Sequence, residues 1–133
     1  MNPLGRTLTM PFLTSLKMES IPPIKTDLGE DSWRMIEPLV YVTKSNLQIV
    51  VPVGYVHDLA SVPRWAWRIV RPDHPTARRP SVVHDYIYTD LTKYLTKKEA
   101  DNIFYEALLE EGTSRVLAWL MWAAVSVGGK GNW

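Results

Sequence analysis

Ser81-Val-Val-His-Asp-Tyr-Ile-Tyr88 is the stretch that organises the second half of this chain, and it has the pattern of a helix start. Ser81 is a residue of the kind that caps the amino end of a helix. Because residues four apart share one helix face, His84 and Tyr88 should project together, while Asp85 points about 100° away from His84. The stretch therefore predicts a polar site on an otherwise apolar helix.

Three helices are expected in this half of the chain. The first runs from Ser81 to about Leu91. The second begins at Thr96-Lys-Lys-Glu99, which matches the capping box, continues through an apolar stripe over 100–108 and ends near Gly112. The third extends from Arg115 to about Val127, after the possible caps Thr113 and Ser114.

The first half of the chain has β character. β-branched and aromatic residues fill about 36–53 and are interrupted by the polar turn Lys44-Ser45-Asn46, which predicts an antiparallel hairpin. A short helix, Pro63 to Val70, follows it. This order of elements, with strands first and helices after them, predicts an α+β fold. In this fold a small antiparallel sheet (the hairpin at about 36–53) is followed by three to four helices packed against it.

Composition sets the broad class. The 133 residues fit a single domain, with an irregular segment over 1–32, where at most one short strand is expected, and a core over 33–133. Without cysteine, thiol catalysis and cysteine-type zinc sites are excluded, so any metal would need histidine and carboxylate ligands. A net charge of +1 gives no general field that would attract nucleic acid, so a nucleic-acid partner is not implied. The first twenty residues lack the continuous apolar core of a signal peptide.

The last predicted helix is apolar on all sides. Its run from Val116 to Val127 is too short for a membrane span, which needs roughly 20 residues. Since Trp119 and Trp122 lie in a helix without a polar face, this chain, a partner or lipid must cover it. Docking of a partner and formation of an oligomer through this helix both stay open.

Distant acidic residues could join the polar site through the fold. The candidate site residues are Asp58, Ser61, His84, Asp85, Tyr88 and Asp101. In one reading Asp58, His84 and Asp101 hold a divalent metal such as zinc, manganese or magnesium, which activates water. In a second, a carboxylate orients His84 as a metal-free general base. In a third, the residues form a buried structural network. A nucleophilic role of Ser61 lacks the G-x-S-x-G turn.

Three short motifs resemble those of one family. Asp58-Leu-Ala-Ser-Val-Pro-Arg64, His84-Asp-Tyr-Ile-Tyr88 and Ala100-Asp101, with a closing Gly and Trp, are similar to the domain of unknown function family 1353 over about 40–133. All six candidate site residues fall on motif positions of that family. It occurs mainly in phages and prophages, so the resemblance implies a phage protein in the host cytoplasm or in the virion. The family carries no established activity.

Two classes of function follow from these observations. The first is a small hydrolase that uses the His/Asp cluster, with or without a divalent metal. The second is a non-enzymatic virion or host-interaction module, in which the cluster is a structural polar network and the aromatic last helix docks on a phage or host protein. An open cleft around His84 would favour the hydrolase, whereas a buried and fully hydrogen-bonded cluster would favour the module.

Overall fold

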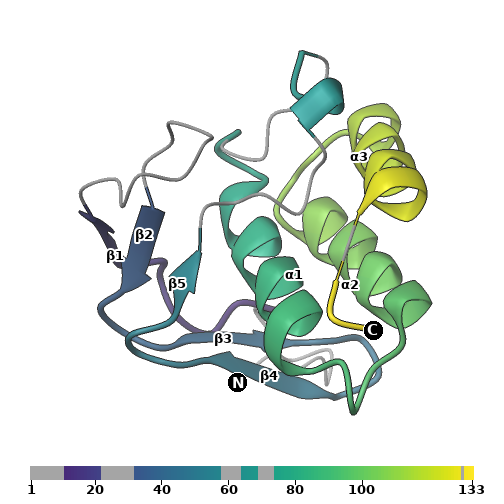
Figure 1. Ribbon diagram of the computed structural model, residues 1–133. Helices are drawn as coiled ribbons and strands as arrows, with labels where there is room; N and C mark the ends of the chain where they lie inside the picture. The colour runs from purple at the N-terminus through teal and green to yellow at the C-terminus, as the bar shows by residue number, and fades with distance from the viewer. Residues whose placement is uncertain (1–10, 22–31, 58–63, 69–73, 130) are drawn as a thin grey trace, which may run out of the picture.

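The computed structural model describes residues 11–21, 32–57, 64–68, 74–129 and 131–133 (Figure 1). These residues form an α+β fold, as predicted. Its elements are β1 (Met18–Ile21), β2 (Ser32–Met35), β3 (Leu39–Val42), β4 (Gln48–Val51), β5 (Val56–His57), the 3-10 helix η1 (Arg64–Ala66), α1 (Arg78–Asp90), α2 (Lys97–Glu110) and α3 (Arg115–Gly128). Asp58 and Ser61 lie outside the described residues.

The strands form two small antiparallel sheets. β3 and β4 make the predicted hairpin, with Leu39 opposite Val51, and Asn46 in its turn adopts the left-handed φ of 66° that asparagine tolerates. The second sheet has the order β1-β2-β5 and pairs Met18 with Met35. The segment over 1–32 is therefore not wholly irregular, because β1 lies within it.

Helix α1 begins one turn earlier than predicted. Ala77 occupies the N-cap position without a side-chain cap, and the Ser81 amide donates to the Ala77 carbonyl at 2.8 Å. Ser81 is thus a buried residue inside the helix, and its prediction as the cap was wrong. Pro80 fits the first turn because amides there have no partner within the helix. Asp85 accordingly lies two turns inside the helix, beyond the reach of its amino-terminal dipole.

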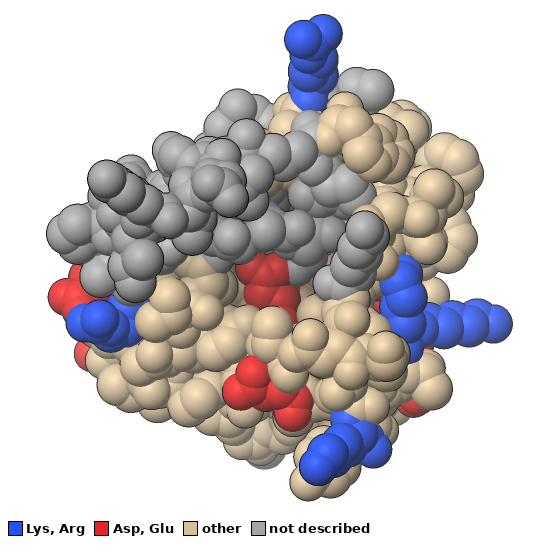
Figure 2. All heavy atoms as spheres, in the orientation of Figure 1, with Lys and Arg blue, Asp and Glu red and all other residues tan. Residues whose placement is uncertain are grey.

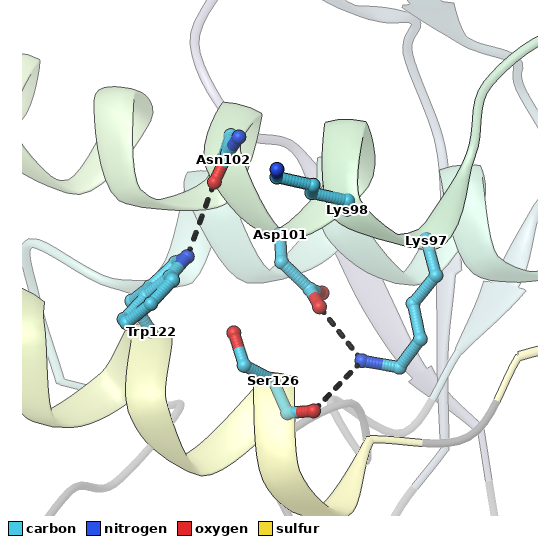
Figure 3. Close-up of a pocket in the computed structure, with 6 residues that line it drawn as sticks. All are labelled: Lys97, Lys98, Asp101, Asn102, Trp122 and Ser126. Carbon is cyan, nitrogen blue, oxygen red and sulfur yellow. Dashed lines mark hydrogen bonds and ion pairs between the residues drawn. The ribbon is translucent and has the colours of Figure 1, made fainter.

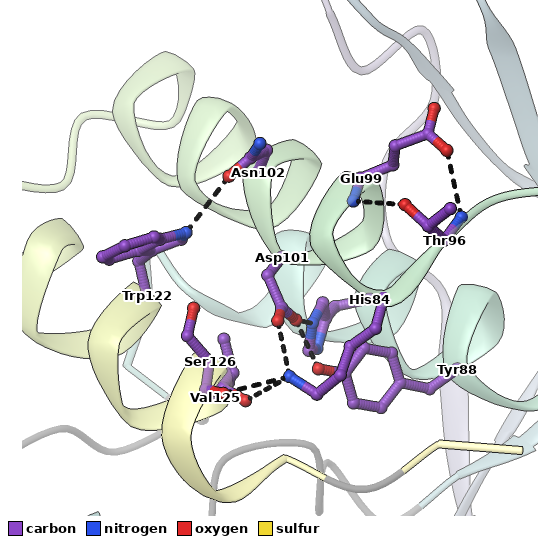
Figure 4. Close-up of polar contacts among 10 residues, drawn as sticks. His84, Tyr88, Thr96, Glu99, Asp101, Asn102, Trp122, Val125 and Ser126 are labelled. Atoms are coloured by element: carbon purple, nitrogen blue, oxygen red, sulfur yellow. Dashed lines mark hydrogen bonds and ion pairs between the residues drawn. The ribbon is translucent and has the colours of Figure 1, made fainter. Parts of the chain in front are cut away.

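Helices α2 and α3 begin where the sequence predicts. The Glu99 amide donates to Thr96 Oγ1 at 3.1 Å and the Thr96 amide donates to the Glu99 carboxylate at 3.0 Å, which completes the capping box (Figure 4). Gly112 follows α2 with a φ of 94°, a left-handed conformation that favours glycine. Ser114 then caps α3 by accepting from the Leu117 amide.

Thr96→Ala is expected to lower the free energy of unfolding by about 1 kcal/mol, because the α2 amides lose their side-chain acceptor. Urea titration of the variant measures this loss. Thr92→Ala, in the turn before α2, is the matched control and should change stability by less than about 0.5 kcal/mol. Equal stability of the Thr96 variant and the parent would contradict a stabilising role for this cap.

The helices pack in sequence order beside the hairpin. α1 packs on β3 and β4 and against α2, while α2 packs against α3, which lies at the outer edge (Figure 1). One apolar core, with Tyr41 and Val83, joins the hairpin to α1; a second, with Phe104 and Met121, joins α2 to α3. Of the helices that the structure describes, none has the length and apolar character to span a membrane.

Two acidic side chains of the α2 region tie this arrangement together. Glu106 accepts from the Tyr41 hydroxyl and, at 2.9 Å, from the Lys44 amide, which fixes the hairpin on α2. Glu111 forms a bidentate pair with Arg79 of α1, with nitrogen–oxygen distances of 2.6 and 3.0 Å. These contacts hold α2 against the hairpin and against α1, beside the candidate site.

Candidate functional site

Four side chains from α1 and α2 form one hydrogen-bonded group, here named the polar cluster: His84, Tyr88, Lys97 and Asp101 (Figure 4). His84 Nε2 lies 2.7 Å from Asp101 Oδ1, and the Tyr88 hydroxyl donates to the same oxygen. Lys97 Nζ donates to Asp101 Oδ2 at 2.7 Å. Helical spacing explains the geometry, since His84 and Tyr88 are four residues apart, as are Lys97 and Asp101.

Lys97 extends the polar cluster to the third helix. Its ammonium also donates to the carbonyls of Val125, at 2.9 Å, and Ser126, at 3.3 Å, in the last turn of α3. A cation there satisfies carbonyls that lack partners within the helix and opposes the negative end of the helix dipole. Sequence reasoning missed Lys97, although its position four residues before Asp101 was an available signal.

Burial fixes the protonation states of the cluster. Complete burial lowers the pKa of His84, more than the hydrogen bond and charge of Asp101 raise it, so the imidazole is neutral. Burial alone would raise the pKa of Asp101, but hydrogen bonds from His84, Lys97 and Tyr88 bring it below its ordinary value. The carboxylate is therefore ionised and accepts, and His84 must donate through Nε2–H.

Tyr88 is the third donor to the carboxylate. Burial, with the hydrogen bond to Asp101, raises the pKa of its hydroxyl far above the ordinary value, which keeps the proton on the oxygen. The remaining ring nitrogen of His84, Nδ1, is buried and has no hydrogen-bond partner among the described residues. Within the described residues, the lone pair on this nitrogen is thus buried without a donor.

Aromatic rings close the cluster. The His84 ring packs against Tyr88 and Phe104, with centroid distances of 4.1 and 4.6 Å. Trp133 folds back on the cluster: its ring meets Tyr88 edge-on at 4.7 Å and its Nε1 donates to the Leu95 carbonyl at 2.8 Å. His84 is 0% exposed, whereas the Lys97 side chain is 34% exposed. Lys97 is consequently the most solvent-accessible member of the cluster.

A pocket of about 390 Å³ opens beside Lys97, between α2 and α3 (Figure 3). Its lining residues are Lys97, Lys98, Asp101, Asn102, Trp122 and Ser126. Trp122 Nε1 donates to Asn102 Oδ1 at 3.2 Å across the two helices, and Asp101 turns its carboxylate toward Lys97. His84 does not line this pocket, so the pocket gives no access to the imidazole.

The predicted site residues are only partly brought together. The expected contact between His84 and Asp101 is present, with Tyr88 joining it. Asp85 is also buried, and its charge helps to raise the pKa of the Tyr88 hydroxyl, but as a carboxylate it cannot donate a hydrogen bond to Asp101. Asp58 and Ser61, which the sequence predicts in the site, lie outside the described residues.

A metal fits the described part of the site poorly. No group of three or more His, Asp or Glu side chains in the described ranges is arranged to hold an ion. Lys97 also occupies the second oxygen of Asp101, where a metal would need a free lone pair. The predicted metal set depends on Asp58 and stays a prediction.

Comparison with known proteins identifies a family without identifying an activity. A family model described as protein of unknown function (DUF1353) matches residues 33–125, a range that contains the whole polar cluster. The search of curated proteins and the search of solved structures each found no match. Because the model spans most of the chain, the protein belongs to the DUF1353 family, as the motifs of its sequence predicted.

Proposed function

We propose that this protein is a non-enzymatic interaction module of a phage, which acts in the virion or on a protein in the host cytoplasm, and that its polar cluster is structural. The observation that carries the proposal is the closure of the cluster. His84 is wholly buried, and three donors occupy the two oxygens of Asp101. A general base must reach the proton that it removes, and the part of the chain that the structure describes leaves His84 no exposed surface for a substrate.

The cluster has a clear structural task. It links α1 to α2 through His84 and Tyr88, and it links α2 to α3 through the contacts of Lys97 with the Val125 and Ser126 carbonyls. A buried polar network with satisfied donors favours one packing of its helices over alternatives. The cluster therefore fixes where α3 lies relative to the rest of the fold.

Helix α3 supplies the surface for interaction. Val116, Trp119 and Val127 are 73%, 54% and 82% exposed. The upper right of Figure 2, where α3 lies in Figure 1, shows mainly uncharged side chains. Since contiguous exposed apolar surface marks sites of association, this face of α3 is the surface that a partner would cover.

A small hydrolase that uses the same cluster is the second candidate. It is favoured by the geometry of His84, which Asp101 orients through Nε2 while Nδ1 keeps a lone pair without a partner among the described residues. A carboxylate and histidine so arranged resemble a general base with its orienting acid. In this version Asp58 and Ser61 would complete the site, with or without a divalent metal.

The free energy of unfolding of suitable variants distinguishes the structural cluster from the hydrolase, and its measurement requires no knowledge of a substrate. Tyr88→Phe keeps the ring and removes one donor to a buried carboxylate, so it should lower the free energy of unfolding by about 1–3 kcal/mol. Tyr86→Phe, on the same helix, is the matched control and should change it by less than about 0.5 kcal/mol. Denaturant titration at neutral pH measures both.

The hydrolase candidate makes the opposite prediction. Active-site groups are often held at some expense to stability, so their removal should leave stability unchanged or increase it. A Tyr88→Phe protein as stable as the parent would count against the structural cluster. Loss of a hydrolytic activity in a cooperatively folded His84→Ala protein would establish the second candidate.

A further inference from the structure

The pocket between α2 and α3 lies beside the polar cluster and has no role in the proposed function, and its walls come from one face of each helix (Figure 3). Lys98 and Asn102 are four residues apart on α2, so they share a face of that helix. Trp122 and Ser126 are related in the same way on α3. The bond from Trp122 Nε1 to Asn102 Oδ1, at 3.2 Å, joins the two faces and fixes the indole ring at the wall of the pocket.

The acceptors of this pocket are already occupied. Three donors of the polar cluster hold the two oxygens of Asp101. Asn102 Oδ1 accepts from Trp122, and the carbonyl of Ser126 accepts from Lys97. A ligand that offers mainly donors, such as an ammonium compound, would therefore compete with bonds that the protein has already formed.

The donors of the pocket, by contrast, are left over. Lys98 Nζ, the Ser126 hydroxyl and Asn102 Nδ2 make no hydrogen bond or ion pair with the described residues. Lys97 offsets the charge of Asp101 at 2.7 Å, which leaves Lys98 as the surplus charge of the lining. The pocket thus combines a cation with two neutral donors, and such a set is suited to an anion with several acceptor oxygens.

We infer that this pocket binds a small phosphate monoester with an aromatic body. Lys98, Ser126 and Asn102 can each donate to one terminal oxygen of such a phosphate, whereas a carboxylate has one oxygen fewer. The indole of Trp122 supplies an apolar wall against which an aromatic ring can pack. The volume of about 390 Å³ lies in the usual range for small-molecule sites. The inference does not depend on the proposed role of α3 as an interaction surface.

Phenyl phosphate is the minimal probe, because it joins one phosphate to one aromatic ring. In hydrogen–nitrogen NMR spectra at constant ionic strength, it should shift the Trp122 Nε1–H resonance with a dissociation constant of roughly 1 mM, since the pocket is open to water. Loss of this resonance in Trp122→Phe assigns it. Phenol, which lacks the anion, and inorganic phosphate, which lacks the ring, should each bind at least about tenfold more weakly.

Two lysine variants distinguish this pocket from general charge attraction. Lys98→Gln should weaken the binding of phenyl phosphate about tenfold, because it removes the charge-assisted hydrogen bond to the phosphate. Lys93→Gln removes the same charge at an exposed position that lines a neighbouring pocket, and it should bind as the parent does. Ser126→Ala keeps the carbonyl that Lys97 contacts and should weaken binding about threefold through the lost donor.

Three results would each overturn the inference. The first is the lack of a saturating shift of Trp122 Nε1–H, or a saturating shift of Trp133 Nε1–H in its place, since Trp133 lines the neighbouring pocket. The second is equal affinity of the parent and Lys98→Gln for phenyl phosphate. The third is binding of phenol or inorganic phosphate as tight as that of phenyl phosphate. None of them affects the structural role of the cluster, which fails separately if Tyr88→Phe leaves stability unchanged.

Discussion

Asp101→Leu is expected to lower the free energy of unfolding by about 3 kcal/mol, because it removes the shared acceptor of a buried polar group. The substitution leaves His84 Nε2–H, the Tyr88 hydroxyl and the Lys97 ammonium without their shared acceptor. Two of these groups are buried, and a buried donor without a partner keeps its full desolvation penalty. The Lys97 contribution is smaller, because that side chain is 34% exposed and its ion pair is partly screened.

The control for Asp101→Leu is Asp90→Leu. Asp90 is exposed at the end of α1, so its replacement should change stability by less than about 0.5 kcal/mol, or raise it slightly by removing an anion from a helix carboxyl end. Urea titration of both variants at neutral pH gives the comparison. Equal effects of the two substitutions would show that the carboxylate of Asp101 stabilises nothing.

Acidification from pH 7 to pH 5 is expected to lower the free energy of unfolding by up to about 2 kcal/mol through His84. Burial lowers the pKa of His84 in the folded protein below its ordinary value of 6.5, so below that pH the unfolded chain binds a proton that the folded chain does not. Stability is thus complete above pH 6.5 and declines as the pH falls. The folded pKa of Asp101 lies below its ordinary value of 3.8, so its contribution is lost only in stronger acid.

Histidine variants identify the source of this pH dependence. His84→Phe should remove most of the decline between pH 7 and pH 5, whereas His74→Gln, at an exposed position, should retain it. Among the described residues, Asp101, Tyr88 and Phe104 contact His84, and the charges of Asp101 and Lys97 both act on its pKa. An unchanged decline in the His84→Phe protein would assign the effect to another group.

Local signals predicted much of the fold. The capping box at Thr96, the glycine stop at Gly112 and the hairpin at about 36–53 each depend on residues close in sequence, and the structure contains all three. The start of α1 was missed because Ala77 gives no side-chain cap for a sequence pattern to reveal. The sheet β1-β2-β5 was missed because its strands have only two to four residues and pair between distant segments.

Only the part of the site that follows from helix geometry could be predicted from the sequence. Helical period placed His84 beside Tyr88, and Asp101 was a candidate that only the fold could bring to them. The pairing of Lys97 with Asp101 could have been read from helical spacing, but its contacts with α3 could not, since those carbonyls follow 28 and 29 residues later and meet Lys97 only through the fold. Asp58 and Ser61 were candidates both from the residues themselves and from the family motifs, and their places in the site stay predictions.

The measurement that tests the structural role of the cluster most directly is a double-mutant cycle between Tyr88→Phe and Asp101→Leu, read by urea unfolding at pH 7. If the hydroxyl and the carboxylate stabilise the fold through each other, the double variant should lose about 1.5–3 kcal/mol less than the two single losses combined, the usual strength of a hydrogen bond to a charged group. Single losses that add to within about 0.5 kcal/mol would mean that the residues act independently, and would contradict the structural network.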